Sequence, residues 1–141
     1  MEKIEKLYTA HASVTGGRNG HIVSSDGVLD LEVRMPKELG GSGGAYTNPE
    51  QLFAAGYAAC FDGALNLVIR TQKVTTGTTQ VNAEVSIGKN NNGGYGLSVE
   101  LQVSIPGVER ELAQELLEKA HQVCPYSNAT RGNIEVTLTL I

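Results

Sequence analysis

One stretch of this sequence, residues 48–70, constrains the fold more than any other. It reads N-P-E-Q-L-F-A-A-G-Y-A-A-C-F-D-G-A-L-N-L-V-I-R. Asn48 can accept hydrogen bonds from the first free backbone N–H groups of a helix, and Pro49 suits the first helical position. Gln51 stands where the partner of a capping box reaches back. The residues that follow are apolar or small on every side, which predicts a helix that other elements cover all round.

The same stretch is nearly long enough to cross a membrane, but its composition favours a protein core. Asp62 and Asn66 interrupt the apolar run, and its many Ala and Gly residues make it only weakly hydrophobic. We therefore expect no membrane insertion. The first six residues contain no apolar signal region, so we expect a cytoplasmic protein.

Length and charge restrict the class further. A chain of 141 residues predicts a single domain, residues 1–141. Its net charge of -4, with a pI near 5.3, provides no basic surface. Nucleic acid is therefore not an expected partner.

Hydrophobic periodicity predicts the remaining elements. Alternation of apolar and polar residues indicates strands at 7–14, 21–24, 28–35, 80–88, 95–105 and 134–141. Asp26-Gly27 is a hairpin signal between the second and third of these strands, and the Asn- and Gly-rich residues 90–94 connect the fourth and fifth. Residues 108–123 show the spacing of an amphipathic helix, which Pro125 should end at Cys124.

The resulting order is βββαββαβ, with antiparallel hairpins and two long helices that need cover, so the predicted class is α+β. A chain of this length has little material with which to bury a helix that is apolar all round. We therefore expect a homodimer, in which a second copy provides the missing surface.

The central helix carries Cys60, one of only two cysteines in the chain. Cys60 lies about eleven residues from the start of its helix, roughly 15 Å at ~1.5 Å per residue, too far for the helix dipole to stabilise a thiolate. Burial would raise the pKa of the thiol, so a reactive Cys60 needs a cation from elsewhere in the chain. Arg18, directly after two glycines, is the best source, and Glu50 could hold its guanidinium in place.

Cys124 is predicted to lie at a helix C-terminus, where the dipole opposes negative charge. That setting suits a thiol that reacts second better than a primary nucleophile. Together the two cysteines fit oxidation of Cys60 to a sulfenic acid followed by disulfide formation with Cys124.

The residues alone leave other interpretations open. Free cysteine is among the most buried residue types, so both thiols could be structural. A zinc site could draw on Cys60, Cys124 and His121 with His11 or His21, although no zinc-finger spacing is present. Cys60 with His121 could form a hydrolase or transferase pair, although no oxyanion element is evident. A non-enzymatic, ligand-binding or structural dimer is a further alternative.

Several blocks of sequence resemble the organic hydroperoxide resistance proteins, a branch of the family that also contains osmotically inducible protein C. The resemblance spans nearly the whole chain and is most specific around the two cysteines. The blocks are Gly16-Gly17-Arg18, Ser25-Asp26-Gly27, residues 47–61 (T-N-P-E-Q-L-F-A-A-G-Y-A-A-C-F) and residues 120–133 (A-H-Q-V-C-P-Y-S-N-A-T-R-G-N).

This resemblance implies an intertwined homodimer in which strands of both subunits wrap long helices. It implies a thiol-dependent peroxidase that prefers organic hydroperoxides, including those of fatty acids, to hydrogen peroxide, and that dihydrolipoyl groups reduce. Carried over by position, Cys60 matches the peroxidatic cysteine, Cys124 the resolving cysteine, Arg18 the activating arginine and Glu50 its carboxylate partner. No metal, flavin or other cofactor is expected.

We expect three aromatic residues near Cys60, Phe53, Tyr57 and Phe61, to favour an organic substrate over hydrogen peroxide. Tyr46 departs from the family pattern, in which a smaller residue is expected, and could narrow the mouth of the pocket.

Overall fold

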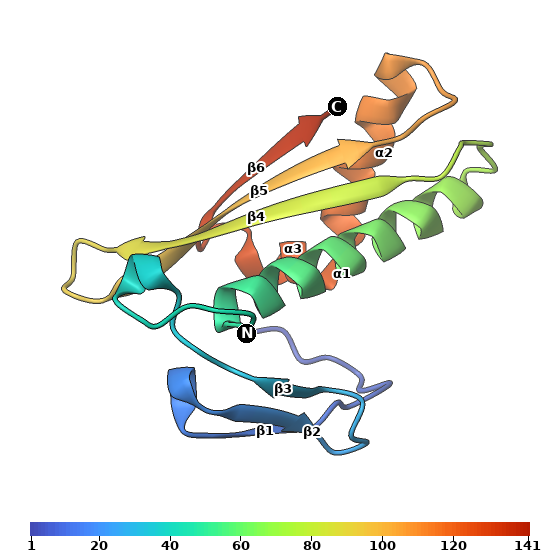
Figure 1. The fold of residues 1–141 in the computed structure, drawn as a ribbon. Coiled ribbons are helices and arrows are strands. Elements are labelled where there is room, and N and C mark those ends of the chain that lie inside the picture. Colours follow the sequence, from blue (N-terminus) through green and yellow to red (C-terminus); the bar gives the residue numbers. More distant parts are fainter. The chain divides into compact units, whose positions relative to one another are not determined.

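The computed structural model describes the whole chain, Met1–Ile141, as two compact units, Met1–Pro49 and Glu50–Ile141 (Figure 1). Each unit contains its own three-stranded sheet. That both units belong to one domain, residues 1–141, stays a prediction.

The first unit is an antiparallel sheet in the order β1-β2-β3. Its strands are β1 (Ala12–Thr15), β2 (His21–Ser24) and β3 (Asp30–Glu32), and two single-turn 3-10 helices, Gly17–Asn19 and Lys37–Leu39, lie between and after them. The first strand is shorter than predicted. Residues 7–11 lie outside the sheet, and Leu7 and Tyr8 are exposed, because β2 has partners only for Ala12–Thr15.

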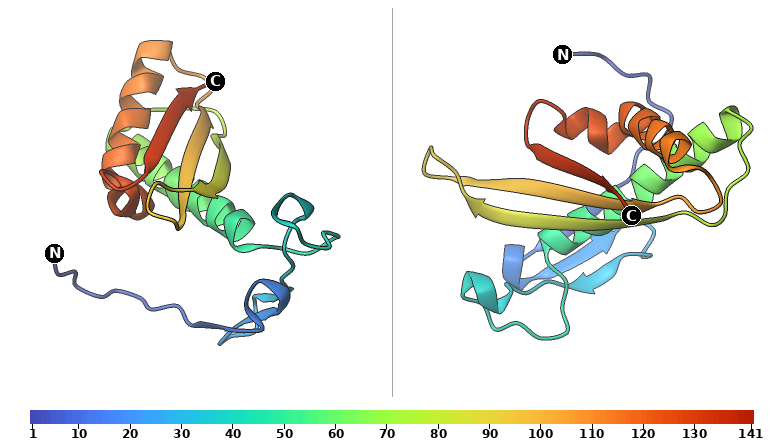
Figure 2. Two further views of the ribbon diagram at one scale, coloured as in Figure 1. Left: turned by 90° about the vertical axis from the view of Figure 1, so that its left-hand side faces the viewer. Right: turned by 90° about the horizontal axis from the view of Figure 1, so that it is seen from above.

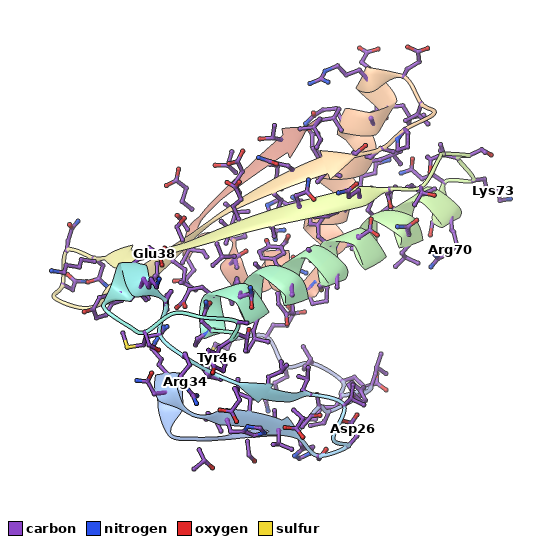
Figure 3. The ribbon with its side chains drawn as sticks, in the orientation of Figure 1. Asp26, Arg34, Glu38, Tyr46, Arg70 and Lys73 are labelled. Atoms are coloured by element: carbon purple, nitrogen blue, oxygen red, sulfur yellow. The ribbon has the colours of Figure 1, made fainter.

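The predicted hairpin between β2 and β3 is confirmed. Asp26 accepts a hydrogen bond from the Ser24 hydroxyl at 2.5 Å and from the Val28 backbone N–H at 3.0 Å. Gly27 follows with a φ of 74°, a conformation that glycine adopts without strain. Figure 3 labels Asp26, which marks the position of this turn.

Arg34 connects β3 to the long glycine-rich loop after it. Its guanidinium pairs with Glu32 at 2.9 Å and lies 4.9 Å from the centre of the Tyr46 ring (Figure 3). Tyr46 thus packs beneath a cation inside its own unit.

The second unit has a longer sheet and three helices. Its elements are α1 (Pro49–Thr71), β4 (Gln80–Lys89), β5 (Tyr95–Ser104), α2 (Arg110–Val123), α3 (Pro125–Thr130) and β6 (Glu135–Leu140). β4 and β5 form the predicted antiparallel hairpin, paired from Gln80–Ser104 to Lys89–Tyr95. β6 runs parallel to β5, so this sheet is mixed rather than purely antiparallel. A parallel partner needs a long crossover, which α2 and α3 provide.

The core of the second unit lies on one face of this sheet (Figure 2). Alternate residues of β5 are buried, and they meet the buried faces of α1 and α2. The residues that make up this core include Tyr57, Phe61, Leu65, Val99, Leu101, Val103, Leu116, Leu117, Ala120 and Cys124. Cys124 is therefore a core residue.

Within one chain α1 is not buried all round, contrary to the prediction. Its exposed residues recur every four positions at Ala55, Ala59, Gly63 and Leu67, a row that we call the α1 stripe. By length and composition alone, α1 could also cross a membrane. Core helices of soluble proteins often have the same length and composition.

The predicted class and element order are otherwise confirmed. Both units combine into βββαββαβ with one addition, the short helix α3, which sequence analysis missed. Pro125 does end α2, but proline is equally suited to the first position of a new helix, and it occupies that position in α3.

Candidate active site

The two cysteines, 64 positions apart in the sequence, lie side by side in the second unit. The Sγ atoms of Cys60 and Cys124 are 3.6 Å apart, and no disulfide joins them. Cys60 is partly exposed, whereas Cys124 has no exposed surface. The α1 helix and the α2–α3 junction therefore bring together the two thiols that sequence analysis singled out.

Cys124 terminates one helix and starts the next. Its backbone N–H donates to the Ala120 carbonyl and closes α2, and its own carbonyl accepts from the N–H of Asn128 in α3. Its φ and ψ of -60° and 122° are extended, so the chain turns here. Sequence analysis recognised only the first of these two roles.

Opposing effects act on the Cys60 thiol. Burial raises the pKa of Cys60 above its ordinary value, and the neighbouring Cys124 raises it further. The backbone N–H of Tyr126 donates a hydrogen bond to the Cys60 sulfur and lowers the pKa. Within this unit burial is the larger effect, as the sequence analysis anticipated.

Sequence reasoning missed Tyr126 because its contribution comes from the backbone. The available signal was Pro125, since a helix that starts there leaves the next N–H groups without partners inside the helix. The Tyr126 N–H is one of these groups, and its position in the first turn of α3 directs it at Cys60.

Arg18 and Glu50 belong to different units. Arg18 lies in the 3-10 turn Gly17–Asn19, after two glycines with positive φ, and Glu50 lies in the first turn of α1. That they join Cys60 in one site stays a prediction.

Aromatic rings cluster beside the thiols. Tyr126 lies 5.7 Å from the ring of Tyr57 and 6.1 Å from that of Phe53. Tyr126 can lie over α1 because residue 56 is glycine, whose added Cβ would stand 3.0 Å from the Tyr126 hydroxyl. Of the three predicted substrate contacts, Tyr57 and Phe61 have no exposed surface and Phe53 is half-buried. Phe53 and Tyr126 are therefore the rings of this cluster that present surface to a substrate.

A chain of buried hydrogen bonds lies behind the thiols. The Tyr57 hydroxyl is 2.8 Å from the Ser127 hydroxyl and 3.0 Å from that of Thr130. The Ser127 hydroxyl is in turn 2.8 Å from Nδ1 of His121. Burial and the nearby charge of Arg131 lower the pKa of His121, so its imidazole is neutral at physiological pH.

The sulfur atoms contact each other and a backbone amide, and His121 contacts a hydroxyl. In this chain no group of three or more His, Cys, Asp or Glu side chains is arranged to hold a metal ion. No imidazole contact with Cys60 is present in the second unit to support a Cys60–His121 pair.

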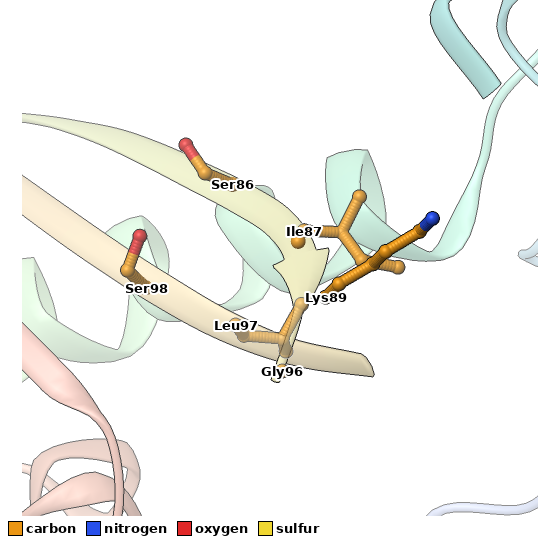
Figure 4. A pocket seen from close by; sticks show the side chains of 7 residues that line it. Ser86, Ile87, Lys89, Gly96, Leu97 and Ser98 are labelled. Atoms are coloured by element: carbon orange, nitrogen blue, oxygen red, sulfur yellow. The ribbon is translucent and has the colours of Figure 1, made fainter. Parts of the chain in front are cut away.

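Two surface pockets of about 290 Å³ each lie elsewhere in the second unit. One lies between the ends of β4 and β5 and is lined by Ile87, Leu97 and Lys89 among others (Figure 4). The other is lined by residues of α1 and α2, including Leu67 and Val123. Neither pocket is lined by a cysteine.

Comparisons with known proteins show which family this chain resembles. The family model described as OsmC-like protein matches residues 41–139. An organic hydroperoxide resistance protein of Xanthomonas axonopodis pv. citri (strain 306) is 58% identical over 95% of this chain and 94% of its own length. The organic hydroperoxide resistance protein OhrB of Bacillus subtilis (strain 168) is 50% identical over 95% of this chain and 98% of its own.

The same similarity holds in three dimensions. A crystal structure of an organic hydroperoxide resistance protein from Elizabethkingia anophelis superimposes with a TM-score of 0.94 at 65% identity. It covers 97% of this chain and 98% of the other.

Proposed function

Because the chain belongs to the OsmC-like protein family, among the organic hydroperoxide resistance proteins, we propose that it is a cysteine-based peroxidase that reduces organic hydroperoxides to alcohols. One observation carries the proposal: a partly exposed thiol with a hydrogen-bond donor lies 3.6 Å from a second, buried thiol. That arrangement supports oxidation of the first thiol and its capture by the second.

In the first step the Cys60 thiolate attacks the hydroperoxide oxygen distal to the alkyl group. The O–O bond breaks, the alkoxide takes up a proton and leaves as the alcohol, and Cys60 remains as a sulfenic acid. The Tyr126 N–H supports the negative charge of the thiolate before attack. Arg18, held by Glu50, supplies a cation that stabilises the Cys60 thiolate against the effect of burial.

In the second step the Cys124 sulfur attacks the sulfur of the sulfenic acid. A disulfide forms and water leaves with the sulfenic oxygen. The Sγ atoms need to approach only from 3.6 Å to a disulfide bond length of about 2.05 Å, so no large rearrangement is required. An external dithiol then reduces the disulfide by exchange, and a dihydrolipoyl group on a carrier protein is the reductant that we propose.

The surroundings of Cys60 favour an organic substrate. Phe53 and Tyr126 present apolar ring surface near the thiol, and Tyr57 and Phe61 support it from within the core. An alkyl or acyl chain gains from covering this surface, whereas hydrogen peroxide has no apolar part to bury. The chemistry needs no metal or other cofactor, and we place the enzyme in the cytoplasm as a homodimer.

The proposal is tested by adding tert-butyl hydroperoxide or hydrogen peroxide, each equimolar, to the reduced protein. Free thiol and the Cys60–Cys124 disulfide are followed by mass spectrometry. We expect rapid disulfide formation with the organic peroxide, slower formation with hydrogen peroxide, and none in a Cys60→Ser variant.

Thiols that survive the organic peroxide would contradict a peroxidase and favour a ligand-binding dimer. Equal or faster reaction with hydrogen peroxide would contradict the proposed substrate class alone.

A further inference from the structure

Only one arrangement of protons makes hydrogen bonds of all four contacts among Tyr57, His121, Ser127 and Thr130. The Thr130 hydroxyl is 3.2 Å from the Ser127 carbonyl, and because a carbonyl can only accept, Thr130 is the donor. Its single proton is then committed, so the Tyr57 hydroxyl must donate to Thr130. Tyr57 has no second proton, so the Ser127 hydroxyl must donate to Tyr57.

This sequence of donors determines the tautomer of His121. Since the only hydroxyl proton of Ser127 is directed at Tyr57, the contact between Ser127 and His121 requires a proton on Nδ1 of the imidazole. The lowered pKa of His121 means that this ring carries a single proton at physiological pH. The arrangement that keeps all four hydrogen bonds therefore has His121 in the Nδ1–H form.

The chain of hydrogen bonds spans all three helices around the thiols. Tyr57 belongs to α1, His121 to α2, and Ser127 and Thr130 to α3. All three hydroxyl-bearing residues are buried and no buried polar side-chain atom lacks a partner, so loss of one member leaves another unsatisfied.

The bond between His121 and Ser127 has a particular consequence, because it closes the segment 121–127 into a loop. That loop contains Cys124 and Tyr126, the two groups that contact the Cys60 sulfur. The Arg131 guanidinium donates to the His121 carbonyl and ties the same loop from outside α3.

We propose that His121, as the Nδ1–H donor to Ser127, is a positioning residue that holds Cys124 in place for disulfide formation with Cys60. This role rests on the proposed peroxidase function. Its physical basis is geometric: without the bond, the 121–127 loop samples other conformations, and the Cys124 sulfur spends less time next to the oxidised Cys60.

Two isosteric substitutions separate a hydrogen-bond donor from a space-filling side chain. In His121→Asn the side-chain amide N–H can stand near the position of Nδ1, whereas in His121→Gln it stands near that of Nε2. Disulfide formation after a single addition of tert-butyl hydroperoxide is followed by rapid quenching and mass spectrometry. Sulfenic acid on Cys60 is measured in parallel with a sulfenic-acid trap in a Cys124→Ser background.

We expect disulfide formation in His121→Gln to be slower by about tenfold, the rate equivalent of roughly one hydrogen bond, with His121→Asn close to the unaltered protein. Trapping of the sulfenic acid should change less than disulfide formation. A His11→Gln variant, in the exposed N-terminal segment, serves as the matched control. Equal rates in the Asn and Gln variants would overturn the proposal.

A second measurement is independent of peroxide chemistry. Two-bond ¹H–¹⁵N nuclear magnetic resonance of the reduced, unaltered protein reports which nitrogen of His121 is protonated. Protonation of Nδ1 supports the proposal, and protonation of Nε2 alone overturns it. If the unaltered protein forms no disulfide with any hydroperoxide while Nδ1 is protonated, the peroxidase function fails and the assigned tautomer stands.

Discussion

At the scale of single residues, the central feature is a thiol on which opposing effects act. Burial raises the pKa of Cys60, and one backbone N–H from Tyr126 only partly offsets it. A thiol in this state is mostly protonated at neutral pH. Each unit by which the pKa rises lowers the fraction of thiolate about tenfold. The second unit alone therefore does not explain a reactive Cys60, which is the physical reason to assign Arg18 to it.

The Arg18→Ala variant tests this assignment directly. We expect the pKa of Cys60 to rise when the guanidinium is removed, and the rate of alkylation at pH 7 to fall by at least about tenfold. The measurement is the pH dependence of iodoacetamide alkylation of Cys60 in a Cys124→Ser background. Arg18→Lys keeps the charge but loses the paired N–H donors of the guanidinium. Its alkylation rate should lie between those of the unaltered protein and Arg18→Ala. An unchanged alkylation profile would remove Arg18 from the site.

What the sequence revealed about the site followed from side chains. Both cysteines and their roles could be argued from residue type, burial and position relative to helix ends. The Tyr126 N–H could not, because every residue except proline carries the same group and only the fold directs it. The chain from Tyr57 to His121 was equally hidden, since it depends on three helices meeting at one place.

At the scale of elements, a small polar cluster attaches α1 to the start of β4. The Thr79 hydroxyl donates to the Asp62 carboxylate at 2.6 Å and accepts from the Asn66 side chain at 2.9 Å. Asn66 also donates to the Asp62 backbone carbonyl. The two polar residues that interrupt the apolar run of α1 therefore hold the residue before β4 against the middle of the helix.

Thr79→Val keeps the shape of the side chain and removes both of its hydrogen bonds. We expect the free energy of unfolding to fall by about 1–2 kcal/mol, because the Asp62 carboxylate and the Asn66 amide each lose a partner. Urea denaturation measures the change. Thr78→Val, at the exposed neighbouring position, is the matched control and should leave stability within about 0.5 kcal/mol. An equal loss in both variants would contradict the role of the cluster.

The β2–β3 pair carries a charge arrangement that responds to pH. His21 on β2 faces Glu32 through Nδ1 and Asp30 through Nε2. The hydrogen bond to Glu32, and to a smaller extent that to Asp30, raises the pKa of His21. Hydrogen bonds from His21 and Arg34 lower the pKa of Glu32. Both ring nitrogens therefore carry protons in the paired state.

The signs give a window of pH for this pair. Because the pKa of His21 is raised on folding, its contribution is complete below the unfolded value of about 6.5 and is lost as pH rises through the folded value. Because the pKa of Glu32 is lowered, its contribution is present above about 4.3 and is lost as pH falls through the folded value.

We expect nuclear magnetic resonance to give a titration midpoint for the His21 ring above about 6.5. An Asp30→Asn, Glu32→Gln double variant should bring it down. A midpoint at or below the ordinary value in the unaltered protein would contradict the arrangement.

Most elements could be predicted from periodicity, and the exceptions have physical causes. β2 matched its prediction because an Asp-Gly turn follows it, while the strand expected over 7–14 shortened because alternation alone provides no partner strand. The parallel pairing of β6 with β5 is a property of topology, and the single strand of alternating residues carried no information about it.

At the scale of the whole molecule, a single chain leaves one apolar helix face exposed and one sheet with almost no core. The α1 stripe exposes small residues and Leu67, which is 47% exposed, on a helix whose other face is core. The first unit has only one buried apolar side chain, that of Val33. Small sheets with so little core are not independently stable, so both features support the expected homodimer.

A dimer predicts a mass in solution of twice 14.9 kDa. We expect Leu67→Glu to shift the protein toward the monomer, because a carboxylate on the α1 stripe would be buried without a partner. Light scattering coupled to gel filtration measures both masses. Tyr95→Glu, an equally drastic change at an exposed residue at the start of β5, is the control. A monomeric mass for the unaltered protein would contradict the dimer.

The different exposure of the two thiols also determines the regiochemistry of recycling. Cys124 has no exposed surface and Cys60 is partly exposed, so an incoming dithiol can reach only one sulfur of the disulfide. In the proposed cycle we therefore expect the mixed disulfide to form on Cys60, with Cys124 as the leaving group. If the proposed cycle holds, the peroxide and the reductant react in turn at the same sulfur atom, and we expect them to compete for access to Cys60.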